Sequence, residues 1–289
     1  FTSSNDYDDN KENNEENIMY TLKSNALECE FNTSEGCLYT ARINNLLSDS
    51  AFIPDGSGCE FEIKFADGTT VSSKNLPISE YAEKDGQLFF RFKEENHTTA
   101  TMRFRVGKDG NTIEKQLVLT QSKPEVIDCI FLENIGIINS RSSYSVPGGE
   151  TDIDAFYSNL GQPFYIDSLF FGCDFPITKN GIFHGRGQVI YYLGKAVEGE
   201  KLVCPTVVIG GEGHLMADLR KAFFKYIESI SLKTPYYLMY NTWYDRMLNI
   251  DADCITEDFY KIEKQLTGHG IPPIDGYVLD DGWPNYKDD

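Results

Sequence analysis

The chain reads PYYLMYNTWYD at residues 235–245 and GYVLDDGW at residues 276–283. Each segment contains a short apolar run, Tyr236 to Tyr240 in the first and Tyr277 to Leu279 in the second. Apolar runs of this length are typical of buried strands. A helical pattern separates them, so the order strand, helix, strand predicts a βαβ unit with two parallel strands.

The helix between these strands is predicted from the spacing of its apolar residues. It is expected to begin with Thr256 as its N-cap and to end at Gly268 or Gly270. The predicted buried stripe comprises Phe259, Ile262 and Leu266. One βαβ unit cannot bury both faces of its sheet. We therefore expect the chain to be truncated relative to a whole catalytic domain.

Residues 18–211 show a different pattern, in which apolar residues alternate with polar ones. Phe61, Ile63 and Phe65 alternate with Glu62 and Lys64, which predicts strands with one buried face. Further alternating residues are Met102, Phe104, Val106, Leu117 and Leu119. Asp-Gly pairs at 67–68, 85–86 and 109–110 suit tight hairpins. Many short strands at this spacing predict a large antiparallel β-sandwich.

Four segments are therefore expected along the chain. Residues 1–17 form a disordered acidic tail, residues 18–211 the β-sandwich, residues 212–232 a linking helix, and residues 233–289 the βαβ unit. The linking helix is predicted from the spacing of Leu215, Leu219, Phe223, Tyr226 and Ile230.

Charge and composition exclude several classes of function. The net charge of −19 disfavours nucleic acid and anionic membranes as partners, and no apolar run is long enough to span a bilayer. The four histidines lack metal-ligand spacing, and neither a metal nor a cofactor is expected. The seven cysteines are scattered, although Cys29 and Cys37 could pair across a hairpin. The acidic tail suggests a secreted or cell-surface protein.

The chemistry is expected at the ends of the two parallel strands, where functional groups of α/β folds gather. Asn241 and Trp243 follow the first strand, and Asp280, Asp281 and Trp283 follow the second. An indole can pack on the apolar face of a sugar while carboxylates accept hydrogen bonds from its hydroxyls. Adjacent buried aspartates would also raise one pKa. The alternative is an ordinary Asp-Asp-Gly turn beside a core tryptophan.

These two segments resemble the first two barrel strands of family 36 glycoside hydrolases, the α-galactosidase and α-N-acetylgalactosaminidase group. SLFFGCDFP at 168–176 and YYLGK at 191–195 also resemble the sandwich domain of that family, so the resemblance covers roughly residues 130–287. Thr242 stands where many members have serine. The resemblance implies a large antiparallel β-sandwich (supersandwich) followed by the start of a (β/α)8 TIM barrel.

The resemblance also implies roles for individual residues. Asp280 and Asp281 would hold hydroxyls of a terminal galactose-type sugar, and Trp243 would line the same pocket. The nucleophile and the acid/base of a retaining glycosidase would lie beyond residue 289, so the chain contains no catalytic residue and is expected to be inactive by itself. Related enzymes often associate, which leaves a homo-oligomer open.

Other interpretations of the sequence remain. The chain could be a non-catalytic carbohydrate-binding or adhesion module whose working part is the β-sandwich, or a different barrel glycosidase that attacks α-glucosides. Gly210-Gly211-Glu212-Gly213 imitates a phosphate-binding loop, but the glycine spacing is wrong and no lysine follows, so a tight turn is favoured. Phe170, Phe171 and Phe175 could line a ligand groove, although core packing is favoured.

Overall fold

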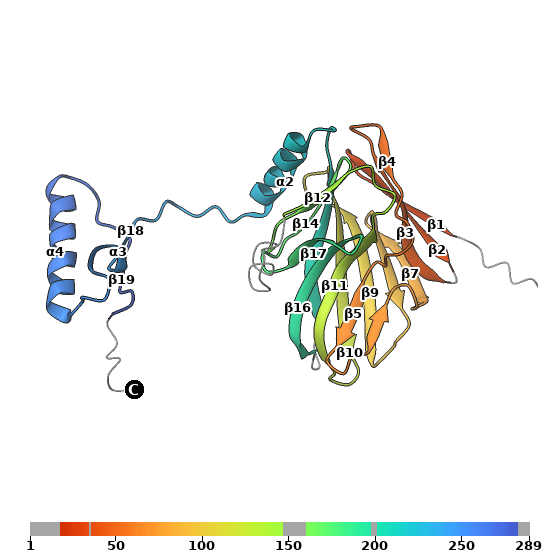
Figure 1. The fold of residues 1–289 in the computed structure, drawn as a ribbon, viewed down its shortest axis with the longest axis horizontal. Coiled ribbons are helices and arrows are strands. Elements are labelled where there is room, and N and C mark those ends of the chain that lie inside the picture. The colour runs from red at the N-terminus through yellow and green to blue at the C-terminus, as the bar shows by residue number, and fades with distance from the viewer. Residues whose placement is uncertain (1–17, 35, 147–159, 198–200, 283–289) are drawn as a thin grey trace, which may run out of the picture. The chain divides into compact units, whose positions relative to one another are not determined.

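The computed structural model describes residues 18–34, 36–146, 160–197 and 201–282 (Figure 1). It contains two compact units, unit 1 up to Ser231 and unit 2 from Leu232 onward. The acidic tail predicted at residues 1–17 lies outside the described residues.

Unit 1 contains three β-sheets. The four-stranded sheet has the order β1 (Met19–Lys23), β2 (Leu27–Ser34), β3 (Cys37–Asn45) and β4 (Ser50–Phe52). The five-stranded sheet has the order β15 (Lys179–Phe183), β16 (Arg186–Ala196), β11 (Val126–Gly136), β5 (Glu62–Phe65) and β6 (Thr70–Ser72). The eight-stranded sheet has the order β12 (Ser143–Ser145), β13 (Phe164–Ile166), β14 (Leu169–Cys173), β17 (Leu202–Gly211), β10 (Ile113–Gln121), β9 (Thr98–Val106), β8 (Gln87–Phe92) and β7 (Ile78–Lys84).

Every strand pair that the structure describes in unit 1 is antiparallel. The hydrophobic core lies between the eight-stranded sheet and the two smaller ones. Phe31 of β2 packs on Phe104 of β9 with ring centroids 4.1 Å apart, and Phe61 meets Phe92 at 5.0 Å. The antiparallel β-sandwich predicted from the alternation is therefore confirmed.

The hairpin turns follow the predicted Asp-Gly pairs. Asp85 and Gly86 connect β7 to β8, and both have positive φ, 52° and 71°. Positive φ at both central residues is the geometry that matches the twist of the flanking strands, and glycine adopts it without steric cost.

Helix α2 (Met216–Ile230) follows β17 and packs against one face of the eight-stranded sheet (Figure 1). Leu219, Phe223 and Tyr226 are buried against a second cluster that includes Phe170 of β14. Two residues of the predicted stripe are not part of this contact. Leu215 is the N-cap and is 67% exposed, and Ile230 in the last turn is 42% exposed, because the sheet covers only the middle of the helix.

The phenylalanines in and just after β14 belong to the core, as favoured above. Phe171 is buried in the main core, Phe170 faces α2, and Phe175 is partly buried against the main core. The pairing of Cys29 with Cys37, which the sequence left open, does not occur. Cys29 lies opposite Ile43 and Cys37 opposite Ser34 in the β2–β3 register, so the two thiols belong to different rungs. All seven cysteines lie in the described residues, and no disulfide joins any of them.

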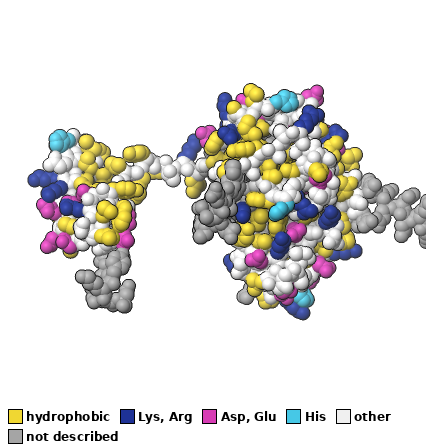
Figure 2. Space-filling model, in the orientation of Figure 1, with side chains coloured by type: hydrophobic (Ala, Val, Ile, Leu, Met, Phe, Trp, Pro, Cys, Tyr) yellow, Lys and Arg dark blue, Asp and Glu magenta, His cyan; other side chains and the backbone are white. Residues whose placement is uncertain are grey.

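Unit 2 contains β18 (Met239–Asn241), α3 (Trp243–Arg246), α4 (Ala252–Gly268) and β19 (Gly276–Val278). The two strands pair in parallel with Asn241 opposite Val278, which confirms the predicted strand direction. Several large apolar side chains are exposed on this unit (Figure 2), Tyr236 at 86% and Tyr244 at 89% among them.

Helix α4 begins one turn earlier than predicted. Its N-cap is Asp251, whose Oδ1 accepts a 2.8 Å hydrogen bond from Cys254 N, while Asp251 N donates to Cys254 Sγ. This capping box satisfies the amides of Asp251 and Cys254 at the start of the helix. Thr256 lies inside the helix, where its Oγ1 donates a 2.6 Å hydrogen bond to the Ala252 carbonyl. The predicted stripe is only half-buried, because a two-stranded sheet offers it little surface.

None of the helices in the described residues has both the length and the apolar character required to cross a bilayer.

Candidate functional site

The ends of β18 and β19 are joined by side-chain hydrogen bonds. Asn241 Nδ2 donates to Asp280 Oδ2 at 2.8 Å. Thr242 is buried, and its Oγ1 accepts a 3.0 Å hydrogen bond from Asp280 N, while Thr242 N donates to the carbonyl of Val278. The parallel register puts both strand ends at one edge of the sheet. The predicted proximity of these two segments is therefore confirmed.

The turn after Asp280 is organised by its own carboxylates. Asp280 Oδ1 accepts a hydrogen bond from Asp281 N, and Asp281 Oδ1 accepts one from Gly282 N, both at 2.8 Å. Gly282 has φ of 99°, and a Cβ there would lie 2.7 Å from the Leu248 Cα. The turn therefore needs glycine at this position, both for its conformation and for its close approach to Leu248.

Asp280 and Asp281 do not form a buried, mutually repelling pair. Asp281 is exposed and Asp280 is half-buried. The hydrogen bond from Asn241, followed by that from the amide of Asp281, lowers the pKa of Asp280 below its usual value. The expected rise of one carboxyl pKa depended on burial and is wrong for Asp280. Asp280 is consequently an ionised hydrogen-bond acceptor at neutral pH.

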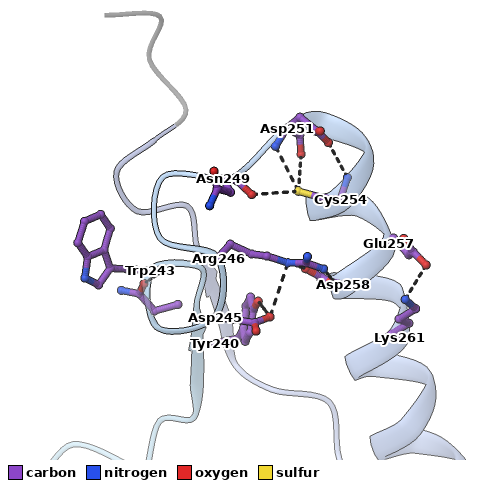
Figure 3. Close-up of polar contacts among 11 residues, drawn as sticks. Tyr240, Trp243, Asp245, Arg246, Asn249, Asp251, Cys254, Glu257, Asp258 and Lys261 are labelled. Atoms are coloured by element: carbon purple, nitrogen blue, oxygen red, sulfur yellow. Dashed lines mark hydrogen bonds and ion pairs between the residues drawn. The ribbon is translucent and has the colours of Figure 1, made fainter.

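The structure describes only one of the two tryptophans that were predicted to line the site. Trp243 N donates a 2.8 Å hydrogen bond to Asn241 Oδ1, so the same amide side chain binds both strand ends. The half-buried Trp243 side chain points away from α4 in the close-up (Figure 3). Trp283 lies outside the described residues.

A second set of contacts holds α3 against α4 below this edge. Arg246 makes two 2.8 Å hydrogen bonds to Asp258, and Tyr240 Oη donates to Asp245 Oδ2 at 3.0 Å (Figure 3). The fork from Arg246 lowers the pKa of Asp258. Burial and the bond to Asp245 raise the pKa of Tyr240 to about 12. These contacts fix the segment that carries Trp243.

The chemistry available at this edge is recognition of hydroxyl groups. Asp280 and Asp281 supply carboxylate acceptors, which form strong hydrogen bonds with hydroxyl donors. The Asn241 side chain is held between Asp280 and Trp243. Within the described part of the chain, no three His, Cys, Asp or Glu side chains form a group suited to a metal ion.

Two features of the structure were not predicted from the sequence. One is Thr242, whose hydroxyl sets the position of Asp280. The other is a cluster in unit 1 in which the buried Lys115 lies 2.9 Å from Glu60 and 3.1 Å from Glu133. A signal for Lys115 was present in the sequence, because it shares the alternating face of Ile113 and Leu117, both core residues.

The glycine-rich segment at 210–213 has a packing role. A Cβ on Gly210 would lie 2.1 Å from the Phe170 ring, and one on Gly211 would lie 2.7 Å from Leu27 Cδ2. Gly210 and Gly211 are the last residues of β17 and pair with Phe170 and Leu169 of β14. The tight turn favoured for these two positions is therefore wrong, and both glycines allow close packing within the sandwich.

The chain was compared with known proteins. No family model and no curated protein sequence matches it. Solved structures do match. The GH36 α-galactosidase AgaB from Geobacillus stearothermophilus is 11% identical, with 92% of this chain and 49% of that chain covered and a TM-score of 0.57. For AgaA of the same organism, in complex with raffinose, the values are 10% identity, 94% and 51% coverage, and a TM-score of 0.54.

The α-N-acetylgalactosaminidase NagBb from Bifidobacterium bifidum is 14% identical, with 73% of this chain and 39% of that chain covered and a TM-score of 0.47. The likeness to AgaB and AgaA shows that the chain has a fold like that of family 36 α-galactosidases, as the resemblance implied. The chain spans about half the length of these two proteins.

Proposed function

We propose that the chain is the N-terminal part of a retaining α-galactosidase-like glycoside hydrolase that acts on terminal α-linked galactose-type sugars of oligosaccharides. The fold likeness supports this proposal, and one observation at the candidate site supports it further. Asn241 Nδ2 lies 2.8 Å from Asp280 Oδ2, so the two segments that resemble family 36 strands meet at one edge.

In this proposal β18 and β19 are the first two strands of a TIM barrel, and their carboxyl ends contribute to the substrate pocket. Active sites of such barrels lie at the carboxyl ends of the strands. Asp280 and Asp281 accept hydrogen bonds from vicinal hydroxyls of the sugar, and the Trp243 indole packs on its apolar face. A lowered pKa keeps Asp280 ionised for this role.

Binding of the sugar is separate from cleavage of the glycosidic bond. A retaining glycosidase places two carboxyl groups about 5 Å apart, one as nucleophile and one as acid and then base. In this proposal both catalytic aspartates are supplied by polypeptide beyond residue 289. The 289-residue chain consequently binds sugar without turning it over.

The test measures p-nitrophenyl α-galactoside hydrolysis by a longer protein that continues past Asp289, and by the 289-residue chain. We expect Asp280→Ala and Asp281→Ala in the longer protein to lower kcat/KM by about 100-fold or more. The matched control is Asp253→Ala, which removes an exposed carboxylate from α4. Turnover by the 289-residue chain, or an unchanged kcat/KM in both variants, would contradict the proposal.

A further inference from the structure

A cavity lies within unit 1, where the four-stranded and five-stranded sheets meet the segment that connects β4 to β5. Its volume is about 400 Å³, and its walls come from the β2–β3 hairpin, from residues 54–60 and from the end of β11. Small-molecule sites usually measure about 300–1,000 Å³, so the cavity can accept a compact ligand. It uses no residue of the β18–β19 edge.

Two carboxylates line the cavity, together with the polar residues Ser34, Thr40, Lys74 and Asn134. The side chains of Glu60 and Glu133 are each 5% exposed, and the single cation between them, Lys115, is 2% exposed. Thr40 donates two hydrogen bonds to Glu60 Oε1, from its N at 2.6 Å and from its Oγ1 at 2.7 Å. Among the described residues Glu60 Oε2 receives only the Lys115 ion pair and no hydrogen bond.

The balance of charge in this wall favours a particular kind of ligand. The Lys115 ammonium lies between the two carboxylates, and Lys74 adds a second, exposed ammonium to the cavity lining. Charges of both signs are therefore already present around the cavity, and Lys115 occupies the position between the carboxylates where a further cation would bind. A neutral molecule with several hydroxyl donors would satisfy the remaining acceptor capacity without adding charge.

Apolar and aromatic residues form another part of the lining. Leu38 and Ile135 are buried and line the cavity, and Tyr39, which is 38% exposed, presents an aromatic ring at its lining. Gly58 allows residues 54–60 to approach β11, because a Cβ there would lie 2.1 Å from the Asn134 carbonyl oxygen. Convergent acceptors beside apolar and aromatic walls match the two faces of a pyranose ring.

We propose that this cavity is a second carbohydrate site, in which a single neutral hexose binds with its hydroxyls on Glu60 and Glu133 and its apolar face against Tyr39. The site is independent of the proposed hydrolase pocket. It would give unit 1 a sugar-binding function of its own.

The test is to titrate the 289-residue chain with D-galactose or D-glucose and to measure its methyl NMR signals at each sugar concentration. We expect the Leu38 and Ile135 methyl signals to shift with saturation, while the signal of Ile113, a core residue outside the cavity wall, stays fixed. Glu60→Gln should raise the Kd at least about tenfold because it removes a charge-assisted hydrogen bond.

Tyr39→Ala provides a variant that leaves the buried cluster intact, and it should raise the Kd about two- to tenfold. Tyr81→Ala is its matched control, since Tyr81 is also 38% exposed and lies outside the cavity wall. Asp280→Ala should leave these shifts unchanged, so failure at one site is distinguishable from failure at the other. The proposal is overturned if neither hexose shifts Leu38 and Ile135, or if Tyr39→Ala binds as the unsubstituted chain does.

Discussion

Asn241 Nδ2 donates a hydrogen bond to Asp280 Oδ2 across the carboxyl ends of two parallel strands. Residues 39 positions apart in the chain are thereby held at one edge of a sheet. The same Asn241 side chain accepts from Trp243 N. One amide group therefore positions an acidic side chain and the segment that carries an indole.

The first prediction concerns the pKa of Asp280. Asn241→Leu removes the main group that lowers this pKa, so we expect it to rise toward the ordinary aspartate value of about 3.9. Because its pKa is lowered in the folded state, Asp280 stabilises the folded chain at pH values above the ordinary aspartate pKa. This stabilisation is lost as the pH falls through the pKa of the folded state. The variant should therefore lose less stability on acidification. A carboxyl NMR titration measures the shift, with Asn249→Leu as an exposed control.

The second prediction concerns the buried lysine of unit 1. Lys115→Met leaves Glu60 and Glu133 without their cation, which should lower the free energy of unfolding by about 3–5 kcal/mol. Replacing all three residues by apolar ones should recover most of this loss, because no buried charge then remains. Urea denaturation measures both effects, and Lys123→Met on the exposed surface should change little. Equal losses in the single and triple variants would contradict this account.

The third prediction concerns pH. Burial, together with the neighbouring Glu60, raises the pKa of Glu133 to about 7, although Lys115 opposes the rise. Between about pH 4.5 and pH 7 the Glu133 carboxyl is ionised in the unfolded chain, whereas it is still protonated in the folded chain. The contribution of Glu133 to stability is therefore greatest below pH 4.5 and declines as the pH rises to about 7.

This decline should be absent in Glu133→Gln, which has no proton to lose. Urea unfolding at several pH values gives the slope of stability against pH for the variant and the parent chain. The exposed Glu80→Gln should keep the parent slope. An identical slope in Glu133→Gln and the parent would show that Glu133 does not titrate in this range.

The fourth prediction tests why glycine occupies position 210. Gly210→Ala would place a methyl group 2.1 Å from the Phe170 ring, and overpacking of this kind costs about 1–3 kcal/mol. Gly213→Ala is the matched control, because the nearest atom to its Cβ, in Asp218, lies 3.7 Å away. Thermal unfolding of the two variants should differ by several degrees. Equal melting temperatures would mean that Phe170 moves aside freely.

The sequence supported the prediction of strands and turns in unit 1 because their signals are local. Alternation identified Phe61, Ile63 and Phe65 as core residues, and all three are buried. Asp85-Gly86 identified a hairpin whose two residues have positive φ. Such patterns depend on neighbours in the chain, so they can be read without knowing the fold.

The errors concern features that depend on the partner of a side chain. Thr256 and Asp251 are both plausible N-caps by residue type, and only the backbone conformation at Asp251 decides between them. Likewise, adjacent aspartates suggested a raised pKa, whereas Asn241 lies close enough to lower that of Asp280. The Lys115 cluster joins residues from separate strands, and no spacing in the sequence indicates which strands will meet.

The Lys115 cluster also has a consequence for how unit 1 unfolds. Lys115 belongs to the eight-stranded sheet, Glu133 to the five-stranded sheet, and Glu60 is held by Thr40 of the four-stranded sheet. Separating the eight-stranded sheet would leave Glu60 and Glu133 without their cation, and separating the four-stranded sheet would remove the two hydrogen bonds that Thr40 donates to Glu60. The three layers should therefore detach together, and amide protons deep in each of them should exchange with solvent through one shared opening event.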